Sequence, residues 1–125
     1  MSTTAAYWDT RAREHDRDPE RCVGYAGVNF QQHSRYVKRL LNGLVLPGHK
    51  VLDVGCGYGR FARTVSARGG FWWGVDFSPA MFERWRRHVR VGAFVCANAR
   101  ELGSVKHVAP FDMILCVGSN GSMGL

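Results

Sequence analysis

Apolar residues follow two different periods along the chain, and the change of period predicts where helices and strands lie. Between residues 30 and 45 they recur every three or four positions, which indicates an amphipathic helix that packs on the sheet. The runs at 51–54 and 71–75 are short and almost continuously apolar, as in strands that a parallel sheet buries on both faces. Residues 58–68 between them again show helical spacing. The apolar residues of the first helix are Tyr36, Val37, Leu40, Leu41 and Leu44.

A third helix is predicted just after the second strand. Ser78 is a good N-cap and Pro79 a good first helical residue, so the helix begins there. Met81, Trp85 and Val89 form one apolar stripe along it, which we expect to pack on the sheet. The rest of the helix surface is expected to be covered by solvated arginines, namely Arg84, Arg86, Arg87 and Arg90.

Two further apolar runs complete a repeating pattern of strands and helices. We expect strands at 93–97 and 111–117, a short helix or turn at 100–107 between them, and a flexible turn at 118–122. This alternation is typical of an α/β fold with a doubly wound, mainly parallel sheet. Ligands bind to such sheets beyond the carboxyl ends of the strands.

The segment 51–60, VLDVGCGYGR, carries the strongest chemical signal of the chain. Gly55, Gly57 and Gly59 allow positive φ and let a ligand lie against bare backbone, directly after a buried strand. The spacing of the glycines distinguishes this turn from two other nucleotide-binding motifs. The nicotinamide and flavin pattern GxGxxG needs a glycine where Arg60 stands, and the GK[ST] sequence of a P-loop does not follow.

Asp76 ends the second strand and is the candidate ligand for a ribose. A carboxylate at this position can accept hydrogen bonds from both ribose hydroxyls of a nucleoside. Each such charge-assisted bond contributes roughly 1.5–3 kcal/mol when it is sheltered from water. The glycine turn and Asp76 therefore predict a nucleoside cofactor.

Four ordered segments within residues 30–120 make the chain resemble the amino-terminal half of a class I S-adenosylmethionine-dependent methyltransferase. VLDVGCGYGR resembles the first motif of that family, GVDFSPAM the second, FVCANAREL the segment beside adenine, and FDMILCVGSN the fourth strand. The resemblance implies a Rossmann-like fold and S-adenosyl-L-methionine as cofactor. It also implies that Asp53 orients the methionine part through its amino group and that Asp76 holds the ribose.

The cofactor-binding residues implied in this way are Asp53, Gly55, Cys56, Gly57, Gly59, Asp76, Phe77, Asn98, Ala99 and Val117. The family often has an acidic residue where this chain has Asn98. An amide there still supplies a donor and an acceptor to an adenine edge, but no charge.

The chain departs from the family by stopping after the fourth strand. We therefore expect a lid or extension at 1–29 and an incomplete cofactor-binding domain at 30–125. A fourth strand as apolar as residues 113–117 would be an exposed edge, which favours pairing with a second copy or a partner chain. The alternative is that the sequence is a fragment of a longer protein.

Composition narrows the class of protein further. The 125 residues suit one domain, and 46% of them are hydrophobic. A net charge of +7 could attract nucleic acid, but we favour arginine on solvated helix faces as its explanation. We expect a cytoplasmic protein, because the sequence shows no apolar run of about 18 residues and no signal-peptide core. The cysteines lack CxxC spacing, so we expect no metal site.

The sequence names neither the methyl acceptor nor a general base. Methyl transfer is an in-line displacement that needs alignment and a dry pocket rather than a protein nucleophile. His15 or His33 could line a pocket mouth, and Ser119 or Asn120 could touch the ligands. Tyr7, Trp8 and Tyr25 are candidates for an aromatic lid over the sulfonium. Two functions remain open: a methyltransferase acting on a small-molecule acceptor, and a non-catalytic cofactor-binding or regulatory fragment. A nicotinamide-binding domain is a third alternative.

Overall fold

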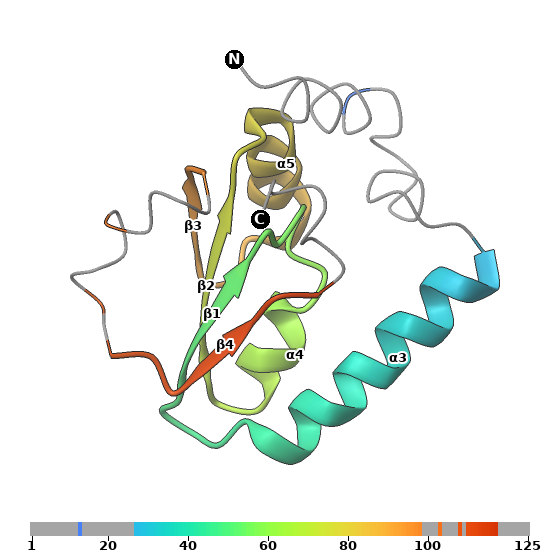
Figure 1. The fold of residues 1–125 in the computed structure, drawn as a ribbon, viewed down its shortest axis with the longest axis vertical. Coiled ribbons are helices and arrows are strands. Elements are labelled where there is room, and N and C mark those ends of the chain that lie inside the picture. The colour runs from blue at the N-terminus through green and yellow to red at the C-terminus, as the bar shows by residue number, and fades with distance from the viewer. Residues whose placement is uncertain (1–12, 14–26, 99–102, 104–107, 109, 118–125) are drawn as a thin grey trace.

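A computed structural model of the chain describes residue 13, residues 27–98, residues 103 and 108, and residues 110–117. Its elements, in chain order, are α3 (Gly27–Leu44), β1 (Lys50–Val54), α4 (Ala62–Ala67), β2 (Phe71–Asp76), α5 (Pro79–Arg84), the π-helix η1 (Trp85–Val89), β3 (Ala93–Cys96) and β4 (Met113–Leu115). Strands and helices alternate along this part of the chain (Figure 1). The α/β fold predicted from the sequence is confirmed.

The four described strands form one parallel sheet in the order β3-β2-β1-β4. β1 lies in the middle, with Asp53 opposite Gly74 of β2 and opposite Leu115 of β4. The carboxyl ends of β1, β2 and β3 therefore meet at one edge of the sheet. β4 is shorter than the predicted strand at 111–117, and it occupies the opposite side of the sheet from β3.

Side chains of the central strands point alternately to the two faces of the sheet, and a core cluster lies on each face. Val51 and Trp72 face the helices, where they join residues of α3 and α4 in the larger cluster. Leu52, Val54 and Val75 form a smaller cluster on the other face of the sheet. Every residue of β1 from Val51 onward is buried, as expected for a central parallel strand.

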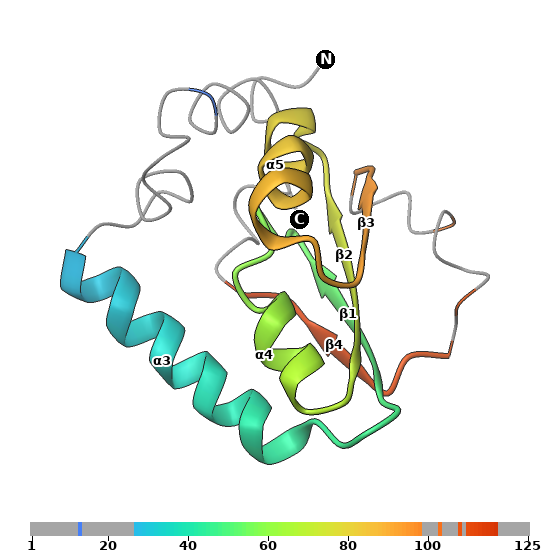
Figure 2. The same cartoon turned by 180° about the vertical axis from the view of Figure 1, so that it is seen from behind.

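The described helices lie on the same side of the sheet, as the reverse view shows most clearly (Figure 2). α4 packs against β2, and α3 runs beside α4. The Ser78 hydroxyl caps α5 by accepting the N–H of Met81 at 3.2 Å, which confirms the predicted N-cap. Within the described part of the chain, no helix is both long enough and apolar enough to cross a membrane.

Only one row of the predicted apolar face of α3 is buried. Val37 and Leu41 enter the core, whereas Tyr36, Leu40 and Leu44 are exposed by 61%, 45% and 58%. The prediction that all five pack on the sheet is wrong for these three. The reason is that α3 lies against α4 and not flat on the sheet, so its contact stripe is narrow.

The predicted solvated position of Arg84 is also wrong, because this side chain is buried. Its guanidinium carbon lies 5.3 Å from the centre of the Tyr58 ring, in the glycine turn. A guanidinium over an aromatic face is stabilised by the ring quadrupole. Beyond Arg84 the helix widens into η1, which ends at Arg90 in a left-handed conformation with φ of 58°.

Candidate functional site

The glycine turn lies at the carboxyl end of β1 and is tied to β2 by backbone hydrogen bonds. Gly55, Gly57 and Gly59 have φ values of 68°, 59° and 88°, which residues with a side chain rarely adopt. The N–H groups of Gly55 and Cys56 both donate to the carbonyl oxygen of Val75, at 2.8 and 3.1 Å. The turn is thus held against the end of the neighbouring strand.

Asp76 is buried at the end of β2, and its two carboxylate oxygens accept hydrogen bonds from the glycine turn and from the N-cap of α5. Oδ2 accepts the N–H of Gly57 at 2.9 Å, and Oδ1 accepts the N–H of Ser78 at 3.0 Å. Burial raises the pKa of Asp76 to about 6, although the backbone N–H groups of Ser78, Gly57 and Phe77 oppose this rise. Its carboxylate is consequently fixed in orientation at the sheet edge.

Asp53 is the second buried carboxylate of this edge and belongs to β1. Its Oδ2 accepts the indole N–H of Trp72 at 3.0 Å. Burial raises the pKa of Asp53 to about 7, and the nearby charge of Asp76 adds to the rise. The Trp72 hydrogen bond and the positive charge of Arg60 act in the opposite direction.

Two buried carboxylates beside a bare glycine turn fit a ligand that carries hydroxyls and positive charge. Asp53 and Asp76 both sit where ionisation is penalised, so a cationic ligand would relieve that penalty. A ribose provides two donors for Asp76, and an ammonium provides donors for Asp53. The donor and acceptor set of this edge therefore matches a nucleoside that carries an amino-acid group, such as S-adenosylmethionine.

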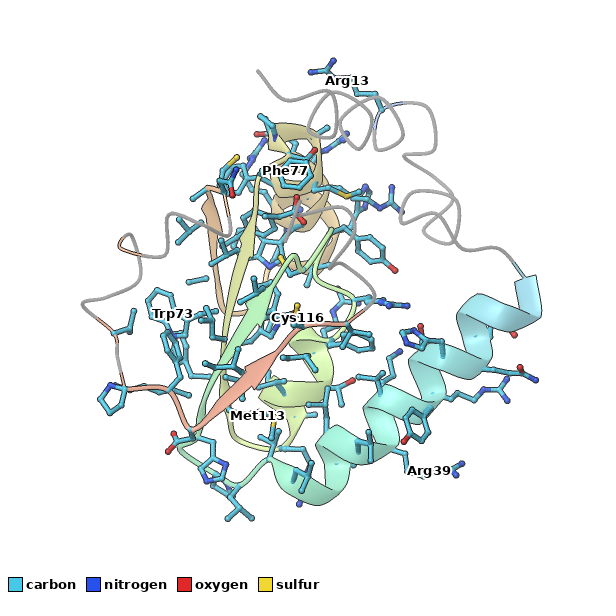
Figure 3. All side chains as sticks on the ribbon, viewed as in Figure 1. Arg13, Arg39, Trp73, Phe77, Met113 and Cys116 are labelled. Carbon is cyan, nitrogen blue, oxygen red and sulfur yellow. The ribbon has the colours of Figure 1, made fainter. Side chains whose placement is uncertain are left out.

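The other residues predicted to bind the cofactor include Cys56, Phe77 and Asn98. Cys56 is buried, its Sγ lies 3.4 Å from the Gly57 carbonyl oxygen, and burial raises its thiol pKa well above the usual value. Phe77 follows β2 near α5, far from Met113 at the start of β4 (Figure 3). Asn98 is exposed two residues beyond β3.

The segments that carry the last predicted residues follow β3 and β4. The N–H of Ala97 donates to the Asp76 carbonyl oxygen at 2.8 Å, which ties the Asn98 segment to the ribose candidate. Val117 is half-buried and packs against the larger core cluster two residues beyond β4. Ala99 lies outside the described residues, and so do the lid candidates Tyr7, Trp8, Tyr25 and His15 and the ligand candidates Ser119 and Asn120.

Sequence reasoning used Arg60 only to exclude a nicotinamide motif and missed its contacts. Its guanidinium donates to Ser34 Oγ at 3.0 Å and lies 3.2 Å from His33 Nδ1. Both partners belong to α3, so Arg60 links the glycine turn to that helix. Burial and the charge of Arg60 lower the pKa of His33, which favours its neutral form beside the arginine.

Trp72 was also missed as a functional residue, although it contacts Asp53 directly. In the sequence Trp72 appears only as one residue of an apolar strand. The one available signal was that Trp72 and Trp73, as consecutive strand residues, point to opposite faces of the sheet. Among the described residues, no group of three or more His, Cys, Asp or Glu side chains is arranged to hold a metal ion.

Comparison with known proteins shows the family to which the chain belongs. A sequence model described as a methyltransferase domain matches residues 51–123. The ubiquinone biosynthesis O-methyltransferase of Pasteurella multocida (strain Pm70) is 40% identical over 53 residues, which are 42% of this chain and 21% of that protein. The matched part of this chain is thus about a fifth of the curated relative.

Solved structures show the same fold. The magnesium protoporphyrin IX methyltransferase of Synechocystis PCC 6803 with bound SAM superposes with a TM-score of 0.67 at 21% identity, covering 98% of this chain and 65% of that one. A SAM-dependent methyltransferase from Thiobacillus denitrificans in complex with S-adenosyl-L-homocysteine gives a TM-score of 0.56 at 22% identity, covering 73% and 38%. With its parallel sheet and glycine turn, the chain belongs to the methyltransferase-domain family of class I S-adenosylmethionine-dependent methyltransferases.

Proposed function

We propose that this chain forms the cofactor-binding part of a methyltransferase that transfers the methyl group of S-adenosylmethionine to a small molecule. The observation that carries the proposal is the pair of buried carboxylates at the edge of the glycine turn: Asp76 accepts the Gly57 N–H of the turn, and Asp53 accepts the Trp72 indole N–H. Family membership supplies the reaction class. The pair would supply acceptors for the ribose hydroxyls and for the ammonium of the cofactor.

Each residue of the pair has a distinct binding role in this proposal. Asp76, fixed by Gly57 and Ser78, would accept hydrogen bonds from the ribose hydroxyls. Asp53, fixed by Trp72, would accept the ammonium of the methionine part. The glycine turn would let the methionine chain approach the backbone closely. When bound, the cofactor supplies the methyl group as an electrophile on a sulfonium.

Further contacts are proposed for the rest of the predicted set. Gly55, Cys56 and Gly59 would line the methionine side through the turn, and Phe77 and Asn98 would flank the nucleoside at the ends of β2 and β3. Ala99 and Val117 complete the proposed set. Alignment and exclusion of water are the contributions expected of these residues, because the displacement needs no protein nucleophile.

A small-molecule acceptor is favoured by the names of the similar proteins. One relative is an O-methyltransferase of ubiquinone biosynthesis, and one structural neighbour acts on magnesium protoporphyrin IX. The second candidate function is a cofactor-binding or regulatory domain without turnover. It is kept because the chain spans 65% or less of these proteins, so residues that hold the acceptor can lie outside the matched region.

The proposal extends to the cellular location and the partners of the protein. Pairing through β4 with a second copy is supported by the 68% exposure of Ile114 at the side of the described sheet. A cytoplasmic location agrees with the absence of a membrane-spanning helix among the described residues. The basic surplus leaves nucleic acid as an alternative partner.

Calorimetric titration of the chain with S-adenosylmethionine, S-adenosylhomocysteine and NADH tests the proposal. We expect both sulfur nucleosides to bind and NADH to give no comparable heat. Folded protein that binds neither sulfur nucleoside would refute the proposed cofactor role. Transfer of a labelled methyl group to a panel of phenols and carboxylic acids then separates the enzyme from the non-catalytic alternative.

A further inference from the structure

Trp72 is fully buried in β2 and reaches across the sheet to Asp53 of β1. Its backbone pairs with Val51, and Asp53 lies two residues further along, opposite Gly74. The indole N–H donates to Asp53 Oδ2 at 3.0 Å. Because Gly74 has no side chain, the ring can pass over it to the carboxylate; a Cβ at Gly74 would overlap Trp72 Cη2.

The indole cannot easily turn away from this contact. A Cβ at Gly59 would lie 3.1 Å from Trp72 Cη2 and 2.9 Å from Trp85 Cδ1, so both rings press against the glycine turn. Trp85 also stacks on Trp72 with ring centres 6.4 Å apart, and Phe94 packs at 6.5 Å. A close-packed neighbourhood of this kind fixes one rotamer, and with it the direction of the N–H group.

Charged and titratable groups surround Asp53 from several elements. Arg60 of the glycine turn favours its ionised form, while Asp76 of β2 disfavours it. Cys56 faces both carboxylates, which raise its thiol pKa further. His33 of α3 contacts Arg60. Burial is the largest influence and favours the neutral acid, and the Trp72 N–H is the largest of the influences that oppose it.

We infer that Trp72 is a positioning residue for cofactor binding: its indole N–H stabilises the ionised form of Asp53 and turns the carboxylate so that Oδ1 meets the ammonium of the cofactor. This inference rests on the proposed function for its ligand, but not for the contact between the two side chains. The indole stabilises the anion by donating a hydrogen bond to it. The anion is the form that attracts an ammonium.

Trp72→Phe tests the inference, because it keeps an aromatic ring in place and removes the donor. Trp85→Phe is the matched control, since the Trp85 N–H donates to the Val91 carbonyl oxygen at 3.1 Å and not to a carboxylate. Carboxyl carbon NMR follows the titration of Asp53 in each protein without any ligand. We expect a midpoint near pH 7 in the wild type and in Trp85→Phe, and a higher midpoint in Trp72→Phe. Equal midpoints in all three proteins would overturn the inference.

Binding of S-adenosylhomocysteine gives an independent readout. We expect Trp72→Phe to weaken affinity roughly fivefold to tenfold at about pH 7 and to approach the wild-type affinity at about pH 9, where Asp53 is ionised in both. A loss of equal size at every pH would show a purely structural role. In an Asp53→Asn background, Trp72→Phe should have no further pH-dependent effect.

Different results would contradict the proposed function and the role of Trp72. Wild-type protein that binds no sulfur nucleoside refutes the proposed function, while the carboxyl titration still decides whether Trp72 controls Asp53. If Trp72→Phe does not fold, the indole proton resonance of Trp72 in the wild type takes its place. That resonance should shift with the Asp53 midpoint, and a position that does not change with pH would overturn the inference.

Discussion

The Gly57 N–H donates to Asp76 Oδ2 at 2.9 Å, so the bare turn and the proposed ribose ligand form one hydrogen-bonded unit. The turn and the carboxylate therefore hold each other in place before any ligand arrives. Ser78 holds the second oxygen of the same carboxylate. A change at any of these three positions is expected to disturb the other two.

Asp76→Asn should weaken the binding of S-adenosylhomocysteine by about 10-fold to 100-fold. This is the effect of losing one charge-assisted hydrogen bond of roughly 1.5–3 kcal/mol to the ribose. Asp112→Asn is the matched control, because that carboxylate accepts the Lys50 N–H at 2.7 Å, at the other end of the sheet. Calorimetry should show unchanged affinity for the control, and similar losses in both variants would contradict the ribose assignment.

Gly59→Ala should destabilise the fold more than Gly48→Ala. Both glycines have positive φ, +88° and +84°, so both substitutions strain the backbone by about 1–2 kcal/mol. Only the new Cβ at Gly59 meets the Trp85 and Trp72 rings, which adds roughly 1–3 kcal/mol of overpacking; that at Gly48 meets nothing within 4 Å. Urea unfolding measures the difference in the free energy of unfolding. Equal losses for the two variants would show that the Trp85 and Trp72 rings move to make room for the new Cβ.

Asp53 and Asp76 should each make the free energy of unfolding of the ligand-free protein fall as pH rises from about 4 to about 7. Their folded-state pKa values, about 7 and about 6, lie above the ordinary value of 3.8. The folded chain therefore holds these protons more tightly than the unfolded chain does, and the stabilisation disappears as they leave.

Asp53→Asn isolates one of these groups, since all other titrating groups are shared with the wild type. Melting temperatures at about pH 5 and about pH 8 should differ more in the wild type than in the variant. Identical pH dependence of the two proteins would mean that Asp53 has the same pKa in the folded and unfolded chains.

Leu41→Ala and Leu40→Ala should have very different effects, although the residues are neighbours on α3. Leu41 is 2% exposed, so its truncation should cost about 2–5 kcal/mol. Leu40 is 45% exposed, so its truncation should change stability by less than about 0.5 kcal/mol. Chemical unfolding compares the free energies of unfolding of the two variants. A large loss of stability for Leu40→Ala would show that the side of α3 that carries Leu40 is covered in solution.

Ile114→Lys should reduce any self-association through β4. A lysine on an edge strand opposes pairing with another chain because it must be desolvated and repels its copy. Size-exclusion chromatography with light scattering at micromolar concentration provides the measurement. A wild-type monomer under these conditions would argue against pairing through β4.

The parts of the site that were predictable from sequence depend on local signals. Asp53, the glycine turn and Asp76 stand at the ends of strands whose apolar runs are bounded by turn residues, so their shared edge follows from a parallel sheet. The Trp72 contact with Asp53 was not predictable in this way. It depends on the register that places Gly74 opposite Asp53 and on the volume left above that glycine.

The two errors in the helices have a similar origin. On α3, two apolar rows are equally good candidates for the core, and only the position of α4 decides that Leu41 rather than Leu40 is buried. At Arg84, charge suggested solvent, but Tyr58 provides an aromatic face for the guanidinium. Both choices depend on neighbours that come from other segments of the chain.

The hydrogen bonds that fix the two carboxylates, Gly57 to Asp76 and Trp72 to Asp53, each span 19 residues of sequence. Both close within the single strand–helix–strand unit from β1 to β2. Closing a loop of this length costs less entropy than closing a longer one. The carboxylate pair can therefore assemble early in folding, as soon as this unit forms, while the segments that would contact an acceptor are free to diverge without dismantling it.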